Sequence, residues 1–124
     1  MPQILAIAAG GAVGAILRFW VSSGVYTLFG RAFPYGTLAV NFIGSLTMGF
    51  LYVMFVDRLS VSPEWRAAIL IGLLGSFTTF STFSLETVNL IEQMELVKAM
   101  LNILISVVAC IVATTIGIII GRGL

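Results

Sequence analysis

Apolar residues fill most of this chain, and charged residues interrupt them only at wide intervals. Three neutral stretches cover residues 32–56, 67–85 and 99–121. An α-helix rises about 1.5 Å per residue, so roughly 20 apolar residues cross the ~30 Å hydrocarbon layer of a membrane. A further stretch at about 3–26 is apolar apart from Arg18, which makes it a span with one embedded or snorkelling cation. The pattern therefore predicts four transmembrane helices in a single domain covering 1–124, at approximately 3–26, 35–56, 66–91 and 97–121.

Polar positions between the spans predict three short connections. The first carries Gly30 and Pro34, and the third lies near 92–98. The second includes Ser62-Pro63-Glu64-Trp65, a pattern typical of a helix start with a serine cap and proline at the first helical position. Because residues 1–3 lack a basic region and Arg18 interrupts any signal-like core, we expect a retained first helix rather than a cleaved signal peptide.

Composition supports the membrane interpretation and excludes several classes of function. Of the 124 residues, 60% are hydrophobic and 9% are charged, whereas a soluble domain has about 25% charged residues. A single Cys and the lack of His exclude disulfide frameworks, Cys/His zinc sites and Ser–His or Cys–His catalytic pairs. A net charge of +1 provides no basic surface for nucleic acid. We therefore expect an all-α protein of the lipid bilayer, with no nucleic-acid partner and no enzymatic activity.

Basic residues are nearly balanced across the predicted membrane, so the usual positive-inside bias is almost absent. A chain without a preferred orientation can insert both ways, and two opposite copies can pair as an antiparallel homodimer. The alternative is that so few charges balance by chance. One side carries Arg58, Arg66 and Arg122, and the other carries Arg31 and Lys98, together with Arg18 if that residue belongs to the far end of the first span.

Small residues also recur four positions apart, a spacing that lets helix backbones approach closely. For each pair, packing within the subunit is the simpler interpretation, and packing between subunits is the alternative. The pairs are Gly10 with Gly14, Ser45 with Gly49, Gly72 with Ser76, and Gly117 with Gly121.

Polar side chains form two ladders inside the predicted spans, where an unpaired polar group costs several kcal/mol. A repeat of four residues places them on one helix face, as expected for the wall of a hydrated path. A lone Ser or Thr more often bonds back to its own helix. The amide of Asn41 cannot be satisfied in that way, so it either bridges helices or binds a solute. The ladders are Thr37, Asn41 and Ser45 in the second span, and Asn102, Ser106, Cys110 and Thr114 in the fourth.

The third span is the most polar, with glycines and hydroxyl residues crowded into 72–84. Glycine and threonine lower helix propensity, and Ser and Thr side chains compete for the backbone. We therefore predict a break around 75–79, where freed carbonyls can hold a cation. The alternative is a continuous helix with a polar packing face.

Phenylalanines alternate with these hydroxyl residues. The spacing of Phe77, Phe80 and Phe83 predicts a single stripe along a helix. Such stripes usually face lipid or the core, but the interleaved hydroxyls favour a lining role. Because the edge of an aromatic ring is electropositive, these rings offer weak contacts to an anion, and weak contacts permit conduction.

The same stretch carries a family resemblance. Residues 75–84 (GSFTTFSTFS) resemble the TTFSTFS signature of the Fluc (CrcB) fluoride channels, and the blocks at 10–18 (GGAVGAILR) and 36–41 (GTLAVN) agree with it. The resemblance covers essentially the whole chain. It implies a passive, selective fluoride channel of the bacterial plasma (inner) membrane that relieves cytoplasmic fluoride toxicity. It also implies an antiparallel, dual-topology homodimer with two pores and a structural sodium ion on the dimer axis.

The resemblance assigns roles to individual residues. Backbone carbonyls of Gly75 and Thr78 from both subunits would hold the sodium ion. Phe80 and Phe83 would line the pores, and Asn41 would donate a hydrogen bond there. The expected fluoride pathway also includes Thr37, Ser81, Thr82, Ser106 and Thr114.

Other residues match less closely or without a defined role. Asn102 and Cys110 stand where the family pattern favours hydroxyl groups, and Ser76 replaces the second glycine of a common Gly-Gly pair. Arg18 and Glu86 match positions near the aqueous vestibules, with a purely structural pairing as the alternative.

Two other functions fit a four-span protein of this size. A proton-coupled small multidrug exporter needs a carboxylate deep in its first helix. Residues 3–26 contain no Asp or Glu, and Glu86 comes late in the third span. A non-conducting scaffold subunit is the remaining possibility.

Overall fold

The computed structural model describes residues 2–124, and all of its regular structure is helical. Helix α1 spans Pro2–Phe29, and α2 spans Tyr35–Val53, continuing into the π-helical segment η1 at Met54–Arg58. The third stretch comprises α3 (Pro63–Arg66), η2 (Ala67–Leu73), α4 (Leu74–Phe77) and α5 (Phe80–Glu92). Helix α6 spans Leu96–Gly123.

Four helical stretches are long and apolar enough to cross a membrane, which confirms the all-α prediction with four spans. Each predicted span lies inside one of them. The stretches are Pro2–Phe29, Tyr35–Arg58, Pro63–Glu92 and Leu96–Gly123.

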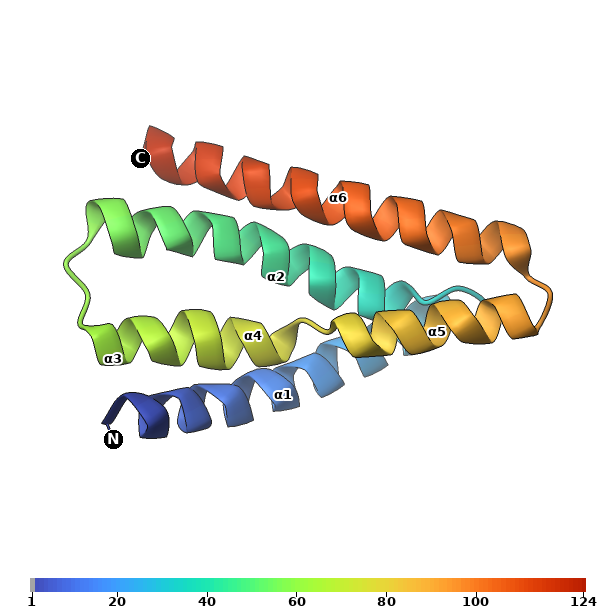
Figure 1. Cartoon of the computed structure of the whole chain (residues 1–124), viewed down its shortest axis with the longest axis horizontal. Helices are drawn as coiled ribbons and strands as arrows, with labels where there is room; N and C mark the ends of the chain where they lie inside the picture. Colours follow the sequence, from blue (N-terminus) through green and yellow to red (C-terminus); the bar gives the residue numbers. More distant parts are fainter. Residues whose placement is uncertain (1) are drawn as a thin grey trace.

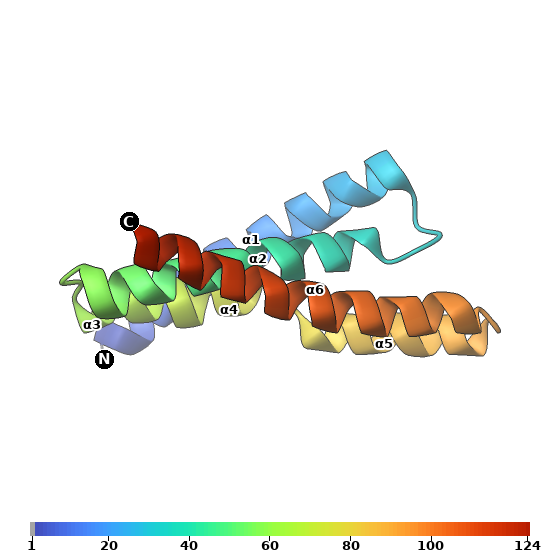
Figure 2. The same ribbon diagram turned by 90° about the horizontal axis from the view of Figure 1, so that it is seen from above.

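The four helical stretches lie side by side in an elongated bundle, and successive stretches run in opposite directions (Figure 1). Helix α2 packs along α6, and α1 packs against η2 and α4. Both ends of the described chain lie with the α2–α3 connection at one end of the bundle (Figures 1 and 2). From above, the second half of α1 and the start of α2 diverge from α5 and α6 (Figure 2).

The start of the third stretch follows the pattern seen in the sequence. Ser62 caps α3, because its hydroxyl oxygen accepts a hydrogen bond from the Trp65 N–H at 3.3 Å. Pro63 occupies the first helical position, where its missing N–H leaves no bond unmade. This part of the prediction is confirmed.

Glycines bring the helix backbones into contact within the subunit, as the simpler interpretation of the small-residue pairs expects. A Cβ atom on Gly14 would meet the backbone carbonyl of Leu73 in η2. A Cβ atom on Gly117 would meet the Leu46 carbonyl and lie 2.7 Å from the Phe50 nitrogen in α2. The α1–η2 and α2–α6 seams therefore depend on residues without side chains.

We expect Gly117→Ala to lower the stability of the protein by about 1–3 kcal/mol, because the added methyl group overpacks the α2–α6 seam. Thermal unfolding in detergent measures the effect. Gly24→Ala is the matched control, since no atom lies within 4 Å of its added Cβ. Equal melting temperatures for the two variants would contradict the close-packing interpretation.

Two residues between α4 and α5 are extended rather than helical. Thr78 has φ −88° and ψ 157°, and Thr79 has φ −151° and ψ 120°. Both lie within the range 75–79 in which the sequence predicts a break. They separate Phe77, which is buried at the end of α4, from Phe80 at the start of α5.

The expected stripe of three phenylalanines is therefore wrong in part. Helical spacing does not continue across extended backbone, so Phe77 is not in register with the other two rings. The rings of Phe80 and Phe83 do pack together, with centroids 5.3 Å apart.

Candidate functional site

A cavity of about 400 Å³ lies beside the two extended residues, between α2, α5 and α6. Five residues predicted for the pathway line it, and so do Ser45 and Cys110 from the two polar ladders. Met48, Val107 and Ile111 add apolar wall, and no Lys or Arg of the described chain lines it. The five predicted residues are Asn41, Phe80, Phe83, Ser106 and Thr114.

Asn41, in α2, holds the extended backbone between α4 and α5. Its Nδ2 donates to the Thr79 carbonyl at 3.0 Å, and its Oδ1 accepts from the Thr79 N–H at 2.7 Å. Of the two interpretations left open by the sequence, the structure shows the bridging one. An amide carries two N–H donors, so one of them is left over on the cavity wall.

The interruption changes the partners of several backbone carbonyls. In a continuous helix the Thr79 N–H would bond to the Gly75 carbonyl and the Thr82 N–H to the Thr78 carbonyl. Instead the Thr79 N–H donates to Asn41, and the Thr82 N–H donates to the Thr79 hydroxyl oxygen at 3.2 Å. The carbonyls of Gly75 and Thr78 therefore lose their helical donors.

Arg18 in α1 bonds to the backbone just before the extended residues Thr78 and Thr79. Its Nε donates to the Ser76 carbonyl at 2.9 Å, a group whose helical donor would have been the N–H of Phe80. The embedded cation of the first span thus satisfies a helix-end carbonyl, where positive charge is favourable.

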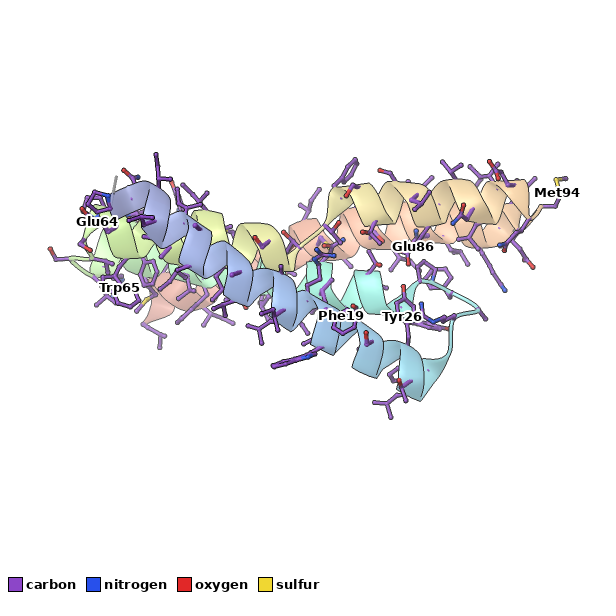
Figure 3. The ribbon with its side chains drawn as sticks, turned by 90° about the horizontal axis from the view of Figure 1, so that it is seen from below. Phe19, Tyr26, Glu64, Trp65, Glu86 and Met94 are labelled. Atoms are coloured by element: carbon purple, nitrogen blue, oxygen red, sulfur yellow. The ribbon has the colours of Figure 1, made fainter. Side chains whose placement is uncertain are left out.

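Glu86 lies elsewhere, in a second cavity of about 160 Å³ under the α1–α2 connection. Tyr26 on α1 and Glu86 on α5 point toward one another (Figure 3), and the Tyr26 hydroxyl donates to Glu86 Oε2 at 2.7 Å. The other carboxylate oxygen is buried without a hydrogen-bond partner among the described residues. The Arg31 guanidinium lies 4.4 Å from the centre of the Tyr26 ring. Arg18 and Glu86 therefore have separate partners and do not form a pair.

Three residues predicted for the pathway do not line the main cavity. Thr37 is buried, and its hydroxyl lies 3.4 Å from that of Tyr26, on the side of Glu86. Ser81 and Thr82 lie in the first turn of α5. The Thr82 hydroxyl oxygen accepts from Thr79 at 3.1 Å, so its own proton is left to donate.

The fourth-span ladder divides into two parts. Ser106 and Thr114 line the cavity, but the Thr114 hydroxyl donates to the Ser45 carbonyl at 3.1 Å. Asn102 is 1% exposed and lies off the cavity, where it bridges α6 to Thr87 of α5. Its amide nitrogen therefore joins α6 to α5, and its amide oxygen accepts from the Ser106 hydroxyl at 3.2 Å.

Sequence reasoning missed two residues of this site. Thr79 both binds Asn41 and caps α5, and a threonine directly before a new helix was the signal for the cap. Thr87 meets Asn102 across two helices, so spacing along the chain gave no sign of it.

The family described as CrcB-like protein, Camphor Resistance (CrcB), has a sequence model that matches residues 5–118. Among the similar relatives is the fluoride-specific ion channel FluC of Methylococcus capsulatus, 54% identical over 122 residues, which cover 98% of this chain and 54% of that protein. The FluC of Magnetococcus marinus is 49% identical, with 97% of this chain and 98% of the relative covered. For the FluC of Shewanella amazonensis the identity is 50%, and 94% of each chain is covered. The chain spans about half the length of the first relative and nearly all of the other two, and it belongs to the CrcB family.

Proposed function

We propose that this chain forms a fluoride channel, which lets cytoplasmic fluoride leave the cell down its electrochemical gradient and so relieves fluoride toxicity. The observation that carries the proposal is the main cavity, in which amide and hydroxyl groups and two phenylalanine rings meet without a fixed positive charge. Relatives of nearly the same length are named fluoride-specific ion channels, which supports it.

The chemistry of the cavity suits a small anion that must leave its water shell. Conduction requires attraction that permits both binding and release. A lysine or arginine on the wall would hold fluoride tightly, whereas one free amide N–H of Asn41 and the ring edges of Phe80 and Phe83 attract it weakly. Chloride is larger, and we propose that the narrow path excludes it by width.

The direction of transport follows from acid–base chemistry. Hydrogen fluoride crosses a membrane as a neutral molecule and ionises inside the cell. The membrane potential, negative inside, then drives the trapped anion outward through a passive channel. No coupling carboxylate is needed.

Efflux from proteoliposomes tests the proposal. Purified protein is reconstituted into vesicles loaded with fluoride, the membrane potential is clamped with valinomycin, and an ion-selective electrode follows the release. We expect rapid fluoride efflux and little release from matched vesicles loaded with chloride. Vesicles that retain fluoride, or that release both halides equally, would contradict the proposal.

The small multidrug exporter has no support in the site. That chemistry needs a carboxylate deep in the first span, and α1 (Pro2–Phe29) contains no Asp or Glu. Glu86 lies on α5, at the smaller cavity.

We also propose that the working unit is an antiparallel homodimer with dual topology and two pores, in a bacterial plasma membrane. The balance of basic residues across the membrane supports both insertions. Phe80 supports a partner, because its ring is 75% exposed in one subunit although it borders the cavity.

The third span would work as a broken helix that holds a structural sodium ion on the dimer axis. Sodium is a hard cation and prefers oxygen ligands, and the carbonyls of Gly75 and Thr78 have lost their helical donors. Two carbonyls from each subunit would supply ligands that one subunit lacks.

We expect sodium to stabilise the dimer, so protein purified in potassium alone should melt at a lower temperature and regain stability on addition of millimolar sodium. Thermal unfolding with lithium as the control cation measures this. An unchanged melting temperature in sodium would contradict the ion site.

The dual topology has a separate test. Tags on the chain termini that report only one side of the membrane would contradict it.

The smaller cavity and the start of α5 are proposed as the vestibules. Ser81 and Thr82 offer hydroxyls near the mouth of the path, and Thr37 lies close to the Tyr26–Glu86 bond. Arg18 would attract anions toward the segment between α4 and α5, where it holds the Ser76 carbonyl.

A further inference from the structure

A buried chain of hydrogen bonds joins α6 to α5 behind the main cavity. The Ser106 hydroxyl lies 3.2 Å from Asn102 Oδ1, and Asn102 Nδ2 lies 2.9 Å from the Thr87 hydroxyl oxygen. Thr87 in turn lies 2.8 Å from the carbonyl of Phe83. Asn102 and Thr87 are 1% and 6% exposed and do not line the cavity, so water does not compete for the bond between them, whereas Ser106, 7% exposed, borders the cavity.

The Phe83 carbonyl, at the end of this series of hydrogen bonds, sets the direction of every proton in the series. A carbonyl only accepts, so the single hydroxyl proton of Thr87 is committed to the Phe83 carbonyl. Thr87 must therefore accept from the amide nitrogen of Asn102, which places the amide oxygen toward Ser106. Ser106 is then the donor in its bond to Asn102.

This direction has a consequence for the cavity, because Ser106 lies on its wall. A hydroxyl group has one proton and two lone pairs. With the proton committed to Asn102, Ser106 presents only lone pairs to the cavity, and lone pairs repel an anion. For Ser106 to donate to fluoride, its proton must leave Asn102 Oδ1.

We propose that Asn102 is a positioning residue that controls the Ser106 proton, so that its amide oxygen competes with fluoride for that donor. This inference rests on the proposed fluoride channel. Asn102 would keep the occupied state weak and thereby favour release of the ion. Thr114 is bonded to a backbone carbonyl, which no side-chain substitution removes, so Asn102 and Ser106 are the pair that mutagenesis can test.

The test is a double-mutant cycle in proteoliposomes, with the fluoride concentration for half-maximal initial efflux as the readout. The variants are Asn102→Leu, Ser106→Ala and the double variant, with Asn102→Ala as a smaller replacement in case Leu prevents folding. Thr115→Val is the matched control, since that hydroxyl on the same helix bonds back to the Ile111 carbonyl. Gel filtration and thermal unfolding establish that each variant is folded.

We expect Asn102→Leu to lower the half-maximal fluoride concentration roughly two- to tenfold, the range of one competing hydrogen bond. The same substitution in the Ser106→Ala background should have no effect on that concentration. A purely structural Asn102 would change both backgrounds alike, and that result, or no change in either, would overturn the inference. If wild-type vesicles release no fluoride, both the proposed function and this inference fail. If wild-type efflux saturates with fluoride but the effects of Asn102→Leu and Ser106→Ala simply add in the double variant, only this inference is overturned.

Discussion

Asn41→Asp should reduce fluoride efflux at least about a hundredfold while leaving the protein folded. The carboxylate keeps the shape of the side chain and the acceptor for the Thr79 N–H, so the interrupted segment retains one of its two bonds to α2. It loses both amide donors and adds a negative charge to the cavity wall. Two unit charges about 4 Å apart near a protein surface interact by about 4 kcal/mol, enough for a loss of this size. Proteoliposome efflux measures it.

Thr47→Val is the matched control for Asn41→Asp. Thr47 lies on the same helix but bonds back to the Ile43 carbonyl, and it does not line the cavity. We expect wild-type efflux from this variant. Wild-type efflux from Asn41→Asp as well would remove Asn41 from the conduction path and leave it only the bridging role.

Replacing the ring at Phe80 or Phe83 with isoleucine should also impair fluoride efflux, by about tenfold. Isoleucine keeps an apolar wall but removes the electropositive ring edge, and a tenfold effect corresponds to the loss of about 1.4 kcal/mol of stabilisation. Phe80→Ile is the cleaner of the two changes, because Phe80 is 75% exposed and its ring packs on Phe83 at the edge of the subunit rather than in its core. Phe83 is 8% exposed, so Phe83→Ile needs a parallel measurement of thermal unfolding.

The control for the ring substitutions is Phe19→Ile on α1, an exposed phenylalanine (Figure 3) outside the main cavity. Its efflux should equal that of the wild type. Normal fluoride release from both Phe80→Ile and Phe83→Ile would refute the assignment of these rings to the pore.

Polarity inside the spans predicted which side chains share a cavity better than it predicted the hydrogen bonds that each of them makes. Asn41, Ser106 and Thr114 do meet at one cavity, because residues four apart share a helix face and the two ladders belong to helices that pack together. Yet much of their hydrogen-bonding capacity is used inside the protein. Asn41 clamps Thr79, and the protons of Ser106 and Thr114 point to Asn102 and Ser45.

Local sequence rules succeeded where the cause of a structure is itself local. The start of the third stretch at Ser62 and Pro63 depends on one hydroxyl and one missing N–H, and both can be read from the residues. The Phe77–Phe80–Phe83 stripe failed because it assumed helical spacing through Thr78 and Thr79, where the backbone is extended.

The sequence alone determined that the chain has four membrane-length helices, because a bilayer demands long apolar segments whose backbone bonds are satisfied within each helix. It also predicts a break in the third helix around 75–79, since glycine and threonine are poor helix formers there, and within that range Thr78 and Thr79 are extended. Only the tertiary structure decided which groups bond to the backbone of that segment. Asn41 in α2 accepts from the Thr79 N–H, and Arg18 in α1 donates to the Ser76 carbonyl. Likewise, the proton direction from Ser106 through Asn102 to Thr87 depends on contacts between α5 and α6, which no spacing along one helix encodes.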